Sequence, residues 1–159
     1  MPNSDNSRKH LNKLASLMMI VSFLGFVDAV YLSVTRYFEA SVPCTLTHAC
    51  DVVLRSDYST LLGVPVVSLG AIYYLFILFG AYIYLEYGSR LYFKITAAVT
   101  TGGFVFSVWL TYVQAFVLKA FCQYCLLSAL TSTLLFVLGV IVLFKIYVLS
   151  RLPTANDPE

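Results

Sequence analysis

The residues whose type and spacing could do chemistry are the four cysteines. Cys44 and Cys50 have five residues between them, and Cys122 and Cys125 form the motif Cys-Gln-Tyr-Cys. Two residues between cysteines close a small, strained ring, and a thiol at a helix N-terminus has its thiolate stabilised by the helix dipole. The even number and the paired spacing suggest two disulfides. The second pair, in particular, favours a redox-active dithiol.

Two other readings of the cysteines stay open at this point. Two static disulfides are possible, because external loops are often cross-linked in this way. A four-thiolate zinc site is the other alternative, although zinc prefers the Cys-x-x-Cys spacing twice and the Cys44/Cys50 pair does not have it. We therefore expect no metal.

The composition indicates what kind of protein must position these thiols. The chain has 159 residues, of which 60% are hydrophobic and 11% are charged, and its mean hydropathy is +0.84. Soluble domains carry roughly a quarter charged residues. The composition therefore argues against a soluble enzyme, a nucleic-acid-binding protein and a disordered chain, and the net charge of +2 is too small to imply a nucleic-acid partner. An integral membrane protein remains.

Four apolar stretches are long enough to cross a bilayer, which takes about 20 residues per helix. They predict an all-α bundle of four transmembrane helices over residues 14–149, with terminal tails at 1–13 and 150–159. One external loop of nearly 30 residues, about 35–63, joins the first two spans. The predicted spans are Leu14–Val34, Val64–Leu85, Phe93–Leu118 and Cys122–Leu149.

The basic residues predict the orientation. With the N-terminus in the cytoplasm, three basic residues (Arg36, Arg55 and Lys119) fall outside. This is the bias of the positive-inside rule. We therefore expect a multi-pass protein of the cell (inner) membrane with both termini in the cytoplasm and all four cysteines on the extracytoplasmic side. The seven basic residues on the cytoplasmic side are Arg8, Lys9, Lys13, Arg90, Lys94, Lys145 and Arg151.

The chain resembles the vitamin K epoxide reductase family, in its bacterial disulfide-forming branch without a fused thioredoxin-like domain. The resemblance is carried by Cys44, by the run from Cys50 to Ser59, by Gly63-Val64-Pro65 leading into Gly70, and by the segment 112–118 followed by Cys122-Gln-Tyr-Cys125. The order of the pairs matters, because in the DsbB-type quinone oxidoreductases the Cys-x-x-Cys pair comes first.

The resemblance implies a four-helix bundle around a quinone pocket near its external end. Cys125 would lie next to the quinone, of ubiquinone or menaquinone type, with Cys122 as its partner. Cys44 and Cys50 would carry electrons to that pair from a thioredoxin-like (DsbA-like) extracytoplasmic protein through mixed disulfides. Since the chain ends shortly after its last span, we expect that protein to be a separate chain. The implied function is a membrane thiol–quinone oxidoreductase that supports disulfide bond formation.

Two positions depart from the vertebrate pattern of this family. Val66 and Ala129 stand where the vertebrate enzymes have an Asn and a Tyr. This departure favours quinone reduction coupled to protein disulfide formation over epoxide reduction. Reduction of vitamin K epoxide or its quinone remains the alternative activity, and a four-span protein with two structural disulfides is the non-enzymatic alternative.

Two polar residues are further site candidates. Asp28 lies inside the first span, where a carboxyl group is costly and a functional residue is the default interpretation. It could relay a proton, orient the loop, or simply pack within the bundle. Ser56 belongs to the loop motif, near a short helix expected at about residues 50–57. Its hydroxyl could hydrogen-bond the quinone or its own backbone.

Overall fold

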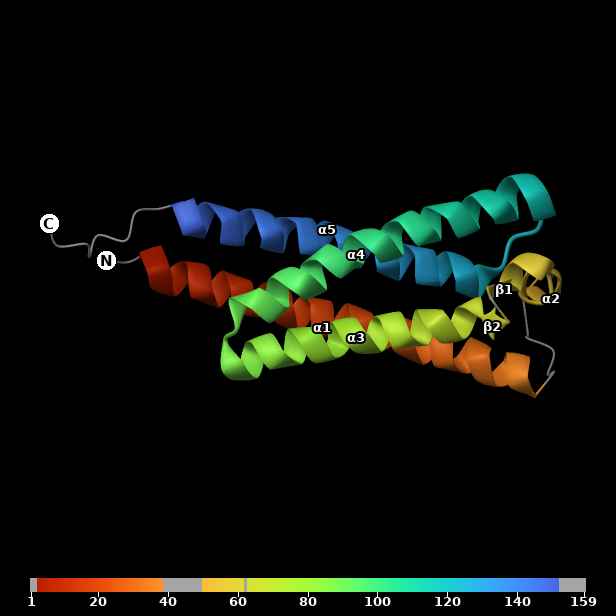
Figure 1. Cartoon of the computed structure of the whole chain (residues 1–159), viewed down its shortest axis with the longest axis horizontal. Helices are drawn as coiled ribbons and strands as arrows, with labels where there is room; N and C mark the ends of the chain where they lie inside the picture. The colour runs from red at the N-terminus through yellow and green to blue at the C-terminus, as the bar shows by residue number, and fades with distance from the viewer. Residues whose placement is uncertain (1–2, 39–49, 62, 152–159) are drawn as a thin grey trace, which may run out of the picture.

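A computed structural model describes residues 3–38, 50–61 and 63–151 as a bundle of four long helices (Figure 1). Helix α4 (Arg90–Tyr112) continues into a π-helical turn, η2 (Val113–Leu118), before α5 (Gln123–Arg151) begins. The expected all-α bundle is confirmed. The four long helices are α1 (Asn3–Tyr37), α3 (Val66–Tyr87), α4 (Arg90–Tyr112) and α5 (Gln123–Arg151).

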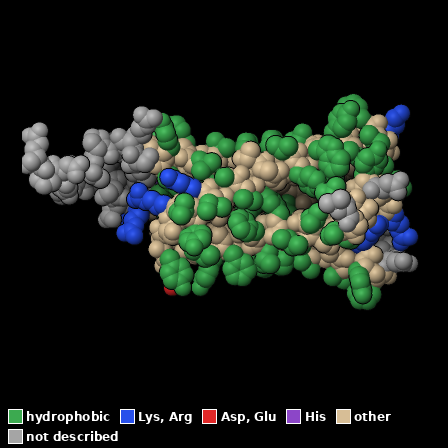
Figure 2. Space-filling model, in the orientation of Figure 1, with side chains coloured by type: hydrophobic (Ala, Val, Ile, Leu, Met, Phe, Trp, Pro, Cys, Tyr) green, Lys and Arg blue, Asp and Glu red, His purple; other side chains and the backbone are tan. Residues whose placement is uncertain are grey.

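The sides of the bundle have the surface of a membrane protein. Each of the four long helices has the length and hydropathy to span a bilayer. Large apolar side chains lie exposed along them, such as Ile20 (57% exposed) and Phe79 (56%). Figure 2 shows this apolar cover along the long sides, with Lys and Arg gathered toward the two ends. Because a water-soluble protein does not expose so much contiguous apolar surface, the chain is a multi-pass membrane protein.

The helices pack in a closed ring. α1 packs against α3 and α5, and α4 packs against the same two helices. The start of α1, the turn between α3 and α4 and the end of α5 lie at one end of the bundle, which we call the terminal end (Figure 1). The opposite end, the cysteine end, holds the segment between α1 and α3 and the connection between α4 and α5. Cys50, Cys122 and Cys125 all belong to this end.

The segment between α1 and α3 is more structured than expected. The predicted short helix is present as α2 (Cys50–Leu54), and a single 3₁₀ turn, η1 (Asp57–Ser59), follows it. The chain then forms a small antiparallel hairpin of β1 (Thr60–Leu61) and β2 (Val64–Pro65), with Leu61 paired to Val64. Gly63 has a φ of 82°, which a residue with a side chain rarely adopts and which suits the tight turn.

Helix α1 begins earlier than its hydropathy predicts. The sequence places a polar tail before Leu14, but the helix already starts at Asn3. Leu11 is only 1% exposed and belongs to the same buried cluster as Ala15 and Met18. Because packing on the bundle continues beyond the apolar stretch, the helix continues with it.

Candidate functional site

Cys122 and Cys125 lie at the first turn of α5, at the cysteine end. Cys122 directly precedes the helix and is fully buried, and its carbonyl accepts a hydrogen bond from the backbone N–H of Leu126 (3.0 Å). Cys125 is half-buried one turn further along. Its backbone N–H lies 3.5 Å from the Cys122 Sγ and donates to it, and both cysteines are free thiols. The motif therefore forms an adjacent dithiol, as its spacing predicts.

The environment of Cys122 favours its thiolate. The Cys125 thiol donates a hydrogen bond to the Cys122 sulfur and lowers the pKa of Cys122 from 9.0 to about 7. Burial opposes this change, and the backbone N–H groups of Cys125 and Tyr124 reinforce it. A thiol with a pKa near neutrality is partly ionised at physiological pH and is also a good leaving group in disulfide exchange.

Gln114 fixes the backbone at this dithiol. Its Oε1 accepts a hydrogen bond from the backbone N–H of Cys122 (3.0 Å), and its own carbonyl accepts one from Ala120 (3.1 Å). Gln114 is 4% exposed and lies in the π-helical turn η2. Single π-helical turns are frequent at functional sites. Gln114 is a site residue that was not predicted from the sequence, although an amide inside an apolar stretch is a usable signal.

Cys50 lies against the same dithiol. It begins α2, is 1% exposed, and packs in one buried apolar cluster with Cys122, Val53, Leu54 and Leu32. In this structure Cys50 is disulfide-bonded. Cys44 lies outside the described residues. The fold thus places a cysteine of the loop beside the first cysteine of the Cys-x-x-Cys motif.

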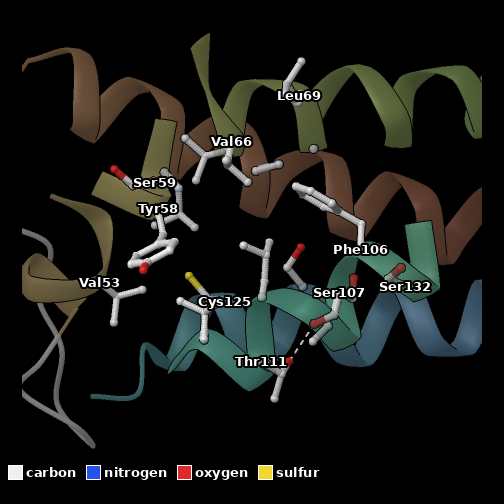
Figure 3. Close-up of a pocket in the computed structure, with 18 of the residues that line it drawn as sticks. Val53, Tyr58, Ser59, Val66, Leu69, Phe106, Ser107, Thr111, Cys125 and Ser132 are labelled. Atoms are coloured by element: carbon white, nitrogen blue, oxygen red, sulfur yellow. Dashed lines mark hydrogen bonds between the residues drawn. The ribbon is translucent and has the colours of Figure 1, made fainter. Parts of the chain in front are cut away.

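A cavity of about 440 Å³ opens beside Cys125. All four long helices and the segment from α2 to β2 contribute to its wall, which is predominantly apolar. Cavities of 300–1,000 Å³ with apolar walls and a few polar groups are the usual form of small-molecule sites. In Figure 3, Cys125, Val53 and Tyr58 lie toward one end of the cavity, and Phe106, Ser107 and Ser132 lie toward the other.

Helix α5 presents one regular face to this cavity. Cys125, Ser128, Ala129 and Ser132 all line it. Their spacing of three, four and seven residues is that of a single helical face. Cys122 is not among the described residues that line the cavity, so the two thiols of the motif have different surroundings. Both cysteines pack with the cluster around α2, Cys122 as a buried member and Cys125 at its edge, but of the two only Cys125 also lines the cavity.

The structure places the two polar candidates differently. Ser56 lines the cavity, and its hydroxyl donates to the Val53 carbonyl (2.8 Å) at the end of α2. Asp28 is not among the described residues that line the cavity. Its Oδ2 is buried without a hydrogen-bond partner in the described part of the chain, and its charge acts on both Cys122 and Cys125.

Further residues that shape the site were not identified from the sequence. The Arg36 guanidinium donates a hydrogen bond to the Leu54 carbonyl and so ties α1 to the end of α2. The Tyr74 hydroxyl bonds the Ser128 carbonyl (2.8 Å) and the Thr131 hydroxyl (2.8 Å), joining α3 to α5. A basic residue at a span end and a tyrosine within an apolar stretch are common in membrane helices, so neither had a distinctive sequence signal.

Val66 and Ala129, the two positions that depart from the vertebrate pattern, both line the cavity. Their side chains offer it no hydrogen bond. The wall at these two positions is therefore apolar, and any polar contact with a bound molecule must come from elsewhere in the cavity.

The comparison with known protein families agrees with this geometry. The family model described as "Vitamin K epoxide reductase family" matches residues 16–140. The matched range contains all four cysteines, Gln114, and every residue that lines the cavity. The chain therefore belongs to the vitamin K epoxide reductase family and is a membrane oxidoreductase.

Proposed function

We propose that this protein oxidises the thiols of an extracytoplasmic thioredoxin-like protein and passes the electrons to a membrane quinone. The observation that carries the proposal is that the two cysteines of the Cys-x-x-Cys motif have different contacts. Cys122 packs against Cys50 of the loop, and Cys125 faces an apolar cavity of about 440 Å³. Such an arrangement connects a loop dithiol to a lipid-soluble acceptor through one turn of α5.

The electron path uses two disulfide exchanges. The reduced partner protein attacks a Cys44–Cys50 disulfide and leaves with its own disulfide, so that the loop pair becomes a dithiol. The Cys50 thiolate then attacks Cys122 of an oxidised Cys122–Cys125 pair and releases Cys125 as a thiolate. Cys44 resolves the Cys50–Cys122 mixed disulfide, which restores the loop disulfide and leaves Cys122 and Cys125 reduced.

The low pKa of Cys122, about 7, suits its part in this path. Resolution of the mixed disulfide is faster when the departing thiol has a low pKa. When bound, a quinone supplies the oxidising power, taking up two electrons and two protons and leaving as the quinol. Reoxidation of Cys122 and Cys125 to their disulfide releases those two electrons and two protons, so that each cycle forms one disulfide in the partner.

The cavity fits a quinone ring. Its wall is apolar at positions such as Val66, Leu110 and Ala129, and Cys125 is the redox-active group in it. The apolar wall at Val66 and Ala129 supports quinone reduction in the disulfide-forming branch of the family over epoxide reduction. Either a ubiquinone or a menaquinone type serves the proposal.

The surrounding polar residues have supporting roles in the proposal. Ser56 holds the loop at the mouth of the cavity through its bond to Val53. Asp28 acts on the thiols through its charge and takes up or returns protons as they change redox state. In this proposal the cysteine end faces the extracytoplasmic side and both termini lie in the cytoplasm. The supporting observation is that seven of the ten Lys and Arg belong to the terminal end.

The experiment is a thiol-oxidation assay in proteoliposomes that contain either ubiquinone or menaquinone. A reduced thioredoxin-like protein is added, and its thiols and the quinol are measured together. The wild-type protein should form one quinol for each disulfide. Cys122→Ser and Cys125→Ser should lose this activity by more than a hundredfold while retaining the monodisperse elution and the thermal stability of a folded protein.

The matched control is Ser22→Ala, which alters a buried α1 hydroxyl that bonds only within its own helix, to the Met19 carbonyl. This variant should keep the wild-type rate. Full turnover by either cysteine variant would refute the proposal. Cys44→Ala and Cys50→Ala should each trap a different mixed disulfide, and mass mapping of these adducts assigns the loop cysteine that meets the partner.

A further inference from the structure

Three buried hydroxyl groups of the cavity wall have no hydrogen-bond partner among the described residues, namely those of Ser59, Tyr73 and Ser132. Ser59, in η1, lies toward the opposite end of the cavity from Ser132 (Figure 3), whereas Tyr73 and Ser132 lie together. Ser132 is 2% exposed, and its Oγ has no hydrogen-bond partner among the described residues. The Tyr73 Oη, from α3, is also buried without a partner in this part of the chain. Both residues line the cavity. The two hydroxyls lie near enough for a weak hydrogen bond with each other, outside normal geometry, and such a bond engages only one of their two donors.

Other hydroxyls of the bundle behave differently. Ser33, Thr111 and Thr133 each donate to the carbonyl four residues earlier, at 2.8, 2.8 and 2.7 Å. Such a bond satisfies a hydroxyl in an apolar environment. A buried polar group without a partner costs free energy. Two buried hydroxyls without a hydrogen-bond partner in a cavity wall therefore indicate a ligand that accepts hydrogen bonds from them.

The fold holds the Tyr73 hydroxyl in place. Gly103, on α4, has no side chain, and a Cβ there would collide with the tip of the Tyr73 ring. The absence of a side chain at Gly103 thus leaves the space that the Tyr73 phenol occupies. The neighbouring Tyr74 also lines the cavity, but its ring lies over Gly25 and its hydroxyl is already bonded to Ser128 and Thr131. Two consecutive tyrosines therefore serve different purposes.

The position of the pair relative to Cys125 has the scale of a quinone ring. Ser132 lies seven residues after Cys125 on the same face of α5, a rise of about 10 Å along the axis. A sulfur-to-ring contact of roughly 3.5 Å, the ring itself, and a hydrogen bond of about 2.8 Å extend over a comparable length. Figure 3 shows Cys125 and Ser132 toward opposite ends of the cavity.

We propose that the Tyr73 and Ser132 hydroxyls are the recognition point for the quinone carbonyl that lies farther from Cys125. This inference rests on the proposed function and adds to it the residues that orient the acceptor. The two hydroxyls donate hydrogen bonds to the same carbonyl region, while the apolar wall contacts the ring. They are positioning and specificity residues, since they bind the acceptor without exchanging electrons with it.

The test measures equilibrium binding by calorimetry in detergent, with 2-methyl-1,4-naphthoquinone as the probe and 2-methylnaphthalene as its carbonyl-free counterpart. The wild type should bind the quinone more tightly than the hydrocarbon. Tyr73→Phe and Ser132→Ala should each weaken quinone binding about threefold to tenfold, as expected for one lost hydrogen bond. The double variant should bind the two probes nearly equally.

A second readout separates recognition from a structural role. Without ligand, both hydroxyls are unpartnered, so Tyr73→Phe and Ser132→Ala should leave the thermal midpoint unchanged or raise it. Tyr74→Phe is the matched control, because it removes a hydroxyl that is fully bonded. It should lower the midpoint and leave the preference for the quinone intact.

The outcomes distinguish this inference from the proposed function. If the wild type binds the quinone and turns over but the double variant binds it equally well, the recognition role is refuted and the proposed function stands. If the two variants lower the thermal midpoint and leave binding unchanged, the pair is structural and the inference is also refuted. If the wild type reduces neither quinone type in the proteoliposome assay, the proposed function itself fails.

Discussion

Removing the Cys125 thiol should raise the pKa of Cys122. The hydrogen bond from Cys125 is the largest influence on the Cys122 thiolate, and burial is the main opposing one. The perturbation is Cys125→Ala, made in a background in which Cys44 and Cys50 are also alanine. Cys122 is then the only thiol that can titrate, and the hydrogen-bond donor is gone while the burial remains.

The expected magnitude follows from the structure. The Cys122 pKa of about 7 lies two units below the ordinary value of 9.0. Each unit corresponds to 1.36 kcal/mol, so the surroundings favour the thiolate by at most about 2.7 kcal/mol. At pH 7, about half of the Cys122 groups are ionised when Cys125 is present. Without that donor the pKa rises above about 7, and fewer of the Cys122 groups are ionised at pH 7.

Thiolate absorbance at 240 nm, followed in detergent from pH 5.5 to 10, measures the titration directly. The parent with both Cys122 and Cys125 should show its first transition near pH 7, which belongs to the coupled pair. The Cys122→Ala variant is the control and should show no transition there. A first transition near pH 9 in the parent would refute the reasoning, as would a transition that stays near pH 7 after Cys125→Ala.

The same shift predicts how stability depends on pH. The pKa of Cys122 is lower in the folded protein than in the unfolded chain, so between pH 7 and 9 the unfolded state binds more protons. The free energy of unfolding of the reduced protein should therefore rise with pH across this window and lose that contribution as pH falls through 7. Protein with an oxidised Cys122–Cys125 pair should not show the slope, because a disulfide does not titrate.

Four further substitutions probe the surroundings of the dithiol and the packing of the helices. Gln114→Leu leaves the buried N–H of Cys122 without an acceptor and should reduce the free energy of unfolding by about 1–3 kcal/mol, measured by denaturation in detergent; an unchanged value would contradict the assigned bond. Asp28→Asn removes a charge that raises the pKa of Cys122, so the first 240 nm transition should move to lower pH, and a move upward would contradict this arrangement. Gly25→Ala forces a Cβ into the tyrosine ring on α3 and should cost about 1–3 kcal/mol, whereas Gly102→Ala, where a Cβ meets open space, should not destabilise the fold.

The parts of the fold that could be predicted from the sequence are those that the bilayer imposes. A span must be helical and apolar along its length, because unsatisfied backbone groups are too costly in lipid. Hydropathy therefore located four helices, and the order of the cysteines in the chain identified the family. The early start of α1 was missed because Leu11 is buried by packing, which a hydropathy window does not see.

The contacts that tune the site could not be predicted in the same way. Gln114 reaches the backbone of Cys122 only because η2 adds a π-helical turn at the end of α4 and the chain then reverses. Tyr73 on α3 and Ser132 on α5 approach each other across the bundle, because both helices pack against α1 and α4. The Tyr73 ring also needs the space that Gly103 leaves. Each of these contacts joins segments whose relative position follows from tertiary packing. The hydrophobic periodicity of a single helix therefore cannot predict them.

Cys122 and Cys125 have different polar groups around them, and the different roles that we propose for the two thiols explain this difference. In the proposed function Cys122 exchanges disulfides, so it needs a stable thiolate and a fixed backbone, which the Cys125 thiol and Gln114 provide. In the same proposal Cys125 meets an apolar acceptor, so its cavity needs hydrogen-bond donors that are available when the acceptor arrives. A hydroxyl that donates to a carbonyl of its own helix must break that hydrogen bond before it can donate to a ligand. The Ser132 hydroxyl has no such hydrogen bond among the described residues. One turn of α5 thus separates a site that stabilises charge from a site that recognises a neutral ring, and a substitution that shifts the start of α5 should impair both.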